Sequence, residues 1–188
     1  MTNVLSRIMS FIVILAALTS ASVSAGVNED RAEVRAATQK VLSTLYQAQP
    51  SARRVVEGAA AHAVFSNFGM KIFFAGGGGG NGIAVSHKTK KEIFMKMLEV
   101  QAGLGLGVKK FGVIFVFENE APFNKFIESG WEFGGQATAA AKYGDKGAAY
   151  QGAVSVAPGV WMYQVTEDGL AFELTAKGTK YYKNDKLN

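Results

Sequence analysis

Cysteine is absent from all 188 residues of the chain. The protein therefore has no disulfide, no thiol nucleophile and no cysteine that could carry a lipid anchor, so we expect its core alone to stabilise the fold. Histidine is almost as scarce, with only His62 and His87. These two absences remove most zinc ligands and most candidates for the base of a hydrolase triad. The sequence predicts no catalytic residue, no metal site and no cofactor.

A long apolar run is also missing. The segment Ile8–Leu18 is too short to cross about 30 Å of hydrocarbon. It follows Arg7 and precedes small residues that end in Val23-Ser24-Ala25, which is the pattern of a secretory signal peptide. We expect residues 1–25 to be a signal peptide cleaved after Ala25, and the protein to be periplasmic or secreted. An uncleaved membrane anchor is the alternative interpretation of this segment.

Only 3 prolines accompany 22 glycines, while 48% of the residues are hydrophobic, which is typical of a folded domain rather than a linker. Apolar residues at helical spacing predict a helix over 28–46 and a second helix over 51–61. Asn119 as N-cap and Gly130 after the last turn predict a later helix over 119–129. Strands are expected at 63–65, 71–75, 83–86, 101–117, 131–142, 150–156, 160–165, 170–175 and 179–183, with turns at 66–69 and 87–91, and 93–100 as strand or helix.

These elements predict an α+β fold. It consists of N-terminal helices followed by a mainly antiparallel, glycine-rich β-sheet or barrel-like core with one inserted helix. We expect a single domain over residues 26–188, with a helical part at 26–61 and a β-rich core at 62–188.

Glycine is concentrated in two places. A run of five precedes Asn81, and three more alternate with aliphatic residues over 103–107, so that they share one face of a strand. The run matches G-x-G-x-x-G, but the dinucleotide fingerprint needs a helix after it, and a β-like segment with basic residues follows here. We therefore interpret these residues as structural glycines at a β corner where backbones pack closely: Gly76, Gly77, Gly78, Gly79, Gly80, Gly103, Gly105 and Gly107.

Lysine provides the functional hypothesis, because the formal net charge is +5. A basic balance favours anionic partners such as phospholipid headgroups. Two lysine clusters follow the two glycine segments, and on one rim they would form a cationic patch. The candidate lipid-binding residues are Lys88, Lys90, Lys91, Lys109 and Lys110. Nucleic acid suits this charge but not an export signal, so we expect no nucleic-acid partner.

Seven segments, taken in order, resemble the SYLF domain family. They are Ala59–Phe65, Phe73–Gly82, Gln101–Gly107, Val113–Glu118, Phe126–Trp131, Gly169-Leu170 and Lys177–Lys180. Ser66 stands where the family usually has proline. The resemblance covers about residues 51–183 and implies a phospholipid-binding domain. Eukaryotic members of the family are associated with phosphoinositide membranes and actin, whereas bacterial members are exported.

The sequence thus predicts a non-enzymatic, exported phospholipid-binding protein of the bacterial envelope that contacts anionic headgroups or a membrane surface through a basic rim. Two alternatives stay open at this point. One is a small outer-membrane β-barrel or envelope structural protein, which the glycine, aromatic and strand content would suit. The other is an enzyme whose site the sequence does not reveal.

Overall fold

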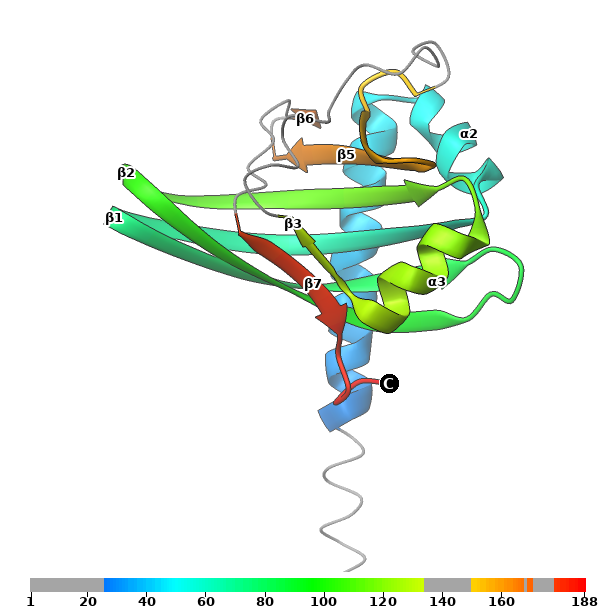
Figure 1. Ribbon diagram of the computed structural model, residues 1–188, viewed down its shortest axis with the longest axis horizontal. Coiled ribbons are helices and arrows are strands. Elements are labelled where there is room, and N and C mark those ends of the chain that lie inside the picture. The colour runs from blue at the N-terminus through cyan, green and yellow to red at the C-terminus, as the bar shows by residue number, and fades with distance from the viewer. Residues whose placement is uncertain (1–25, 134–149, 168, 171–177) are drawn as a thin grey trace, which may run out of the picture.

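The fold is α+β, as predicted, with a mainly antiparallel sheet that forms a half-barrel and helices packed on it (Figure 1). The computed structural model describes residues 26–133, 150–167, 169–170 and 178–188, and for residues 69–76, 101–109 and 133 it describes the backbone alone. Residues 26–48 form the N-terminal helix, and α2 (Ser51–Gly58) follows it.

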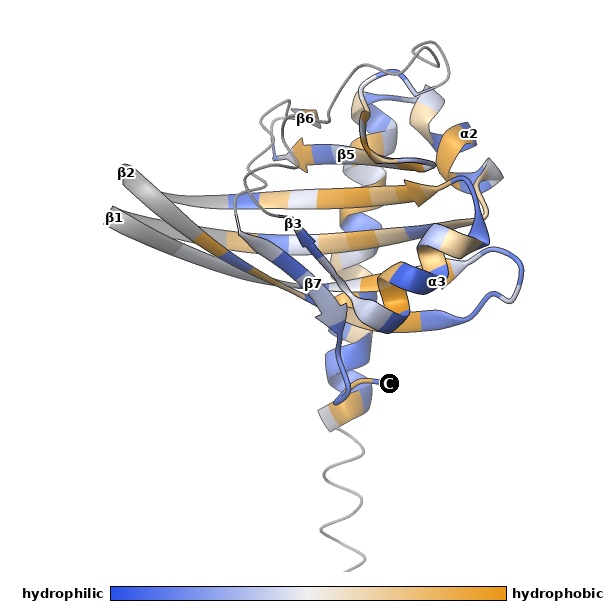
Figure 2. Cartoon of the chain, in the orientation of Figure 1, coloured by the Kyte–Doolittle hydropathy of each residue, from blue (hydrophilic) through white to orange (hydrophobic). Residues whose placement is uncertain are grey.

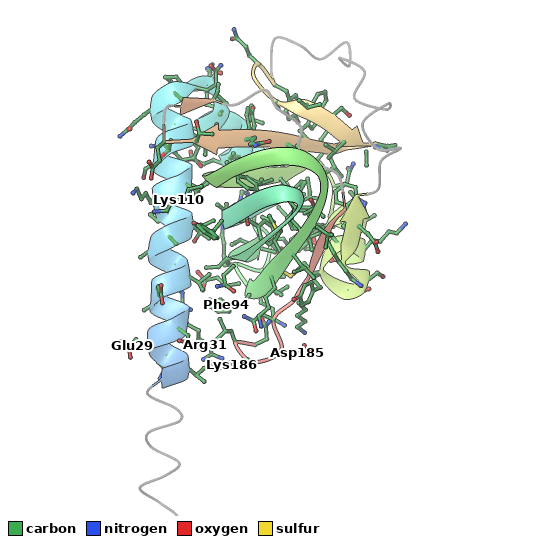
Figure 3. All side chains as sticks on the ribbon, turned by 90° about the vertical axis from the view of Figure 1, so that its left-hand side faces the viewer. Glu29, Arg31, Phe94, Lys110, Asp185 and Lys186 are labelled. Carbon is green, nitrogen blue, oxygen red and sulfur yellow. The ribbon has the colours of Figure 1, made fainter. Side chains whose placement is uncertain are left out.

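Two 26-residue strands organise the fold: β1 (Ala61–Ser86) and β2 (Glu92–Phe117). They pair antiparallel along nearly their whole length, with a register shift between Phe73 and Ala75. The resulting ribbon turns back on itself, as the views along and across it show (Figures 1 and 3). We call residues 61–73 and 105–117 the first arm, and residues 75–86 and 92–102 the second arm.

Shorter strands widen each arm. On the first arm, β5 (Val160–Thr166) pairs with the end of β2. The strands β4 (Val154–Ala157) and β6 (Gly169–Leu170) pair with β5 in turn. On the second arm, β7 (Thr179–Lys183) pairs with Met95–Glu99 of β2 and carries β3 (Trp131–Phe133). The two widened arms form the walls of the half-barrel.

An aromatic core fills the space between the two arms. Phe65 and Phe115 of the first arm meet Tyr181 of β7 at ring-centroid distances of 4.7 and 5.0 Å. The helix α3 (Glu120–Ser129) inserts Phe123 and Phe126 into the same cluster. Asn119 is the N-cap of α3 and Gly130, at φ 70°, ends it, as the sequence predicted. Figure 2 shows hydrophobic segments, coloured orange, along the first arm and on α3.

The opposite, outer side of the sheet is covered by the N-terminal helix and α2. Val41 and Leu45 pack with Ile114 of the first arm and with Tyr163 of β5. Nearer the N-terminus of the same helix, Val34 packs with Ile83 and Phe94 of the second arm and with Leu187. One helix therefore crosses both arms from outside.

Several predicted boundaries are wrong. The segment 66–69 is not a turn but part of β1, because each residue pairs with β2 over 109–112. The second helix ends at Gly58 rather than at 61. The segment 93–100, predicted as strand or helix, is strand. The turn at 87–91 and the strand 179–183 are confirmed. The predicted strand residues 134–142 and 171–175 lie outside the described residues.

Candidate functional site

The glycines of the run lie inside β1, directly after the register shift that separates the two arms. Gly76 to Gly80 pair in regular register with residues 101 to 97 of β2, whereas Gly105 and Gly107 pair with Phe73 and Lys71. The two glycine segments are therefore not partners of each other. Backbones do pack closely at Gly80, one of the predicted glycines, and at Gly82, which was not predicted. A Cβ there would come within 2.6 Å of the Ser66 carbonyl oxygen and 2.5 Å of the Val64 carbonyl oxygen, both on the other arm.

The predicted lysines fall into two separate groups. Lys88, Lys90 and Lys91 are exposed in the turn between β1 and β2, and we call them the turn lysines. Lys109 and Lys110 lie within β2, not in a turn. The side chain of Lys109 is outside the description, whereas Lys110 is exposed and lies opposite Phe68. Lys110 lines a groove with Lys40 and Lys96, and no turn lysine lines that groove.

Sequence reasoning missed a second surface, the outer side of the second arm beyond the N-terminal helix. Met95, Met97 and Glu99 are buried on the inner side, so Lys96, Leu98 and Val100 point outward. On the neighbouring β7, Lys180 and Tyr182 point outward in the same way. We call these five residues, with Gly77 and Gly79 beside them on β1, the open face.

The open face is unusually apolar for a surface. Leu98 is 50% exposed, Val100 62% and Tyr182 36%. Among the described residues only four large hydrophobic side chains are exposed, and these are three of them. The pairing of β2 with β7 places Leu98 opposite Lys180 and Lys96 opposite Tyr182, so two of the three apolar residues have a lysine directly opposite them. On the other flank, Gly77 and Gly79 oppose Val100 and Leu98 and add no side chain.

The N-terminal helix sets the limit of the open face. Phe94, two residues before Lys96, is buried under Arg31 and Arg35, whose guanidinium carbons lie 5.8 and 5.2 Å from the ring centroid. Arg35 also forms an ion pair with Glu92 at 2.8 Å. Figure 3 shows Arg31 and Phe94 at this crossing. From Lys96 onward the outer side of the second arm is exposed or half-buried rather than covered.

A groove of about 1120 Å³ lies in the angle between the N-terminal helix and the two arms. Phe68, the fourth exposed hydrophobic residue, lines it at 46% exposure. Asn67 also lines it and is 4% exposed, and neither its amide nitrogen nor its amide oxygen has a hydrogen-bond partner. Leaving a buried polar group without a partner costs about 1–3 kcal/mol, so Asn67 destabilises the folded state.

The two histidines, distant in sequence, form a pair. The Nδ1 atom of His62, near the start of β1, lies 2.7 Å from the Nε2 atom of His87 in the turn. The His87 amide also donates to the Ala60 carbonyl at 2.9 Å. Burial, and then the neighbouring His87, lower the pKa of His62 to about 4. The two histidines are 25 positions apart in the sequence, so the sequence, which predicted a helix ending directly before His62, gave no sign of this pairing.

Other titratable groups are buried as well. Glu99 is 1% exposed on the inner side, and its proximity adds to the effect of burial in raising the pKa of Tyr181. Burial and a hydrogen bond to Glu118 raise the pKa of Tyr150 to about 12. Within the described ranges, no three His, Asp or Glu side chains gather as a metal site would require. Among those same residues, no helix is long and apolar enough to cross a bilayer.

Comparison with known proteins gives one distant relative. No family model matches the chain. The chain is similar to beta cell expansion factor A of Aeromonas veronii, with 29% identity over 161 residues, which cover 85% of this chain and 59% of the relative. The chain thus spans well under two thirds of the length of that protein. The resemblance to the SYLF domain family remains a prediction.

Proposed function

We propose that this protein is a non-enzymatic, exported protein that binds the anionic phospholipid surface of a bacterial envelope, and that the open face makes the contact. The observation that carries the proposal is the alternation on this face of exposed apolar side chains with lysines. Interfacial binding requires both components: cations attract the protein to anionic headgroups, and apolar groups enter the boundary of the acyl region.

The geometry supports this contact in two further respects. Leu98, Val100 and Tyr182 project from two paired strands, so they are held rigidly on one surface. The neighbouring Gly77 and Gly79 are exposed and flat, so a planar partner approaches without obstruction. The turn lysines, predicted from the sequence, lack exposed large apolar neighbours within the turn and contribute only long-range attraction in this proposal.

Vesicle flotation tests whether the protein binds an anionic lipid surface. The mature chain is mixed with neutral phosphatidylcholine vesicles or with vesicles that also contain phosphatidylglycerol, and the bound fraction is measured. We expect binding to the anionic vesicles alone. Equal recovery with both kinds of vesicle, or recovery with neither, would contradict the proposed function.

Two charge-matched variants then locate the contact. Lys96→Gln with Lys180→Gln removes two charges from the open face, and Lys88→Gln with Lys91→Gln removes two from the turn. At roughly 1 kcal/mol for each lysine at an anionic surface, the first variant should bind about 30-fold more weakly. The second should change little. The reverse order of effects would assign the contact to the basic rim predicted from the sequence.

A further inference from the structure

The groove beside the N-terminal helix has the size and walls of a ligand site. Its volume of about 1120 Å³ is slightly larger than the usual range for small-molecule pockets, which is about 300–1,000 Å³. Its walls come from the helix, from both arms of the ribbon, from the end of β5 and from the C-terminal segment. Such a site between separate elements is fixed by the packing of the fold rather than by one loop.

Several side chains of the groove lining are apolar. Phe68 projects into it from the first arm at 46% exposure, and Leu98 reaches it from the second arm at 50% exposure. Val41 and Ala37 of the helix line it as well. Exposed large hydrophobic residues on two walls of one concavity favour an occupant with an alkyl portion.

Other side chains of the lining are cationic. Lys40 of the helix, Lys96 of the second arm and Lys110 of the first arm all line the groove, and none of them has an ion-pair partner among the described residues. Lys186 lines it too but forms an ion pair with Asp30 at 2.6 Å. Glu33 and Glu167 are the remaining acidic residues of the lining, so the unpaired charges sum to a positive value.

Asn67 gives an independent indication of a ligand. Its side chain is buried where the two arms of β1 meet in the wall of the groove, close to Gly80, and both amide atoms lack partners. Buried amides are normally hydrogen-bonded, so an unpaired one beside a groove suits an occupant that supplies oxygen atoms.

We propose that the groove binds one long-chain anionic amphiphile, with its carboxylate or phosphate among Lys40, Lys96 and Lys110 and its alkyl chain over Phe68 and Leu98. The ligand is a single molecule taken from solution or from a lipid surface. The groove shares Lys96 and Leu98 with the open face. The site still goes beyond the proposed function, because Lys110, Phe68 and Asn67 belong to the groove alone.

Isothermal titration of the mature protein tests this proposal without vesicles. Three probes are used below their micellar concentrations: dodecanoate has chain and charge, acetate has charge alone, and dodecyl maltoside has chain alone. We expect saturable binding of dodecanoate and much weaker binding of the other two. Absence of dodecanoate binding, or equal affinity for dodecyl maltoside, would overturn the proposal. Dodecyl phosphate in a parallel titration distinguishes a phosphate from a carboxylate headgroup.

Variants separate the groove from the open face. Lys110→Gln should weaken dodecanoate binding roughly tenfold, because one charge-assisted hydrogen bond is lost, and Phe68→Ser should weaken it similarly by removing apolar contact. Val100→Ser, which changes only the open face, should leave dodecanoate binding intact while it lowers vesicle recovery. Unchanged dodecanoate affinity in Lys110→Gln and Phe68→Ser would refute the groove site, whatever the vesicle result. Thermal melts confirm folding, which these exposed positions should preserve.

Discussion

Close contact between the two arms of the ribbon makes a strong prediction about glycine. At Gly82 an added Cβ would lie 2.5 Å from the Val64 carbonyl oxygen, and at Gly80 it would lie 2.6 Å from the Ser66 carbonyl oxygen. These are backbone atoms, which cannot rotate away as a side chain can. Gly82→Ala should therefore force the arms apart, at the usual cost of overpacking a core, about 1–3 kcal/mol.

Neighbouring glycines provide matched controls. At Gly77 and Gly79 the nearest atoms would be 3.5 and 3.7 Å from an added Cβ, which is ordinary contact. Gly77→Ala and Gly79→Ala should leave stability unchanged or raise it by up to about 1 kcal/mol, because alanine restricts the unfolded chain.

Thermal unfolding followed by circular dichroism measures the difference between the two classes. For a chain of this size each kcal/mol shifts Tm by about 2–4 °C, so Gly82→Ala and Gly80→Ala should melt several degrees lower than the wild type. Equal melting temperatures for Gly82→Ala and Gly77→Ala would refute the argument that the arms are in contact at Gly82.

Two further predictions concern stability. Because the pKa of His62 is lowered from 6.5 to about 4, the unfolded chain binds more protons between these values, so the free energy of unfolding should fall by up to about 3 kcal/mol from pH 7 to pH 4. Urea titrations at both pH values should show a smaller fall for His62→Gln, and an equal fall would contradict the assignment to His62. Phe126 is 2% exposed and contacts five aromatic rings, so Phe126→Ala should cost about 3–5 kcal/mol. Phe68→Ala, at an exposed position, is its control in the same urea titration, and similar losses for both would contradict the burial of Phe126.

The N-terminal helix, α3 and the last strand were predictable because local sequence signals mark them. Asn119 and Gly130 bracket α3, and Val34, Val41 and Leu45 mark the buried side of the N-terminal helix. The path of β1 was not predictable in this way. Asn67 and Gly69 favour a turn locally, but pairing with β2 holds them in extended conformation.

The open face was missed because its pattern reverses the usual rule. A charged residue is expected on the exposed side of a strand and an aliphatic residue on the buried side. Here Glu99 is 1% exposed and Val100 is 62% exposed, so both lie on the side opposite to the expected one. The inner side accepts Glu99 among buried side chains, and the outer side leaves Leu98 and Val100 uncovered. Such a reversal becomes visible only when the partner strands are known, since β7 comes from 80 residues further along the chain.

The central claim, that the open face contacts an anionic lipid surface, can be tested most directly with the cysteine-free chain. Val100→Cys and Lys88→Cys each introduce one attachment point for an environment-sensitive fluorophore, on the open face and in the turn respectively. On addition of phosphatidylglycerol vesicles, the label at position 100 should shift to the emission of an apolar environment, and the label at position 88 should stay in water. An apolar shift at position 88 with none at position 100 would contradict the claim.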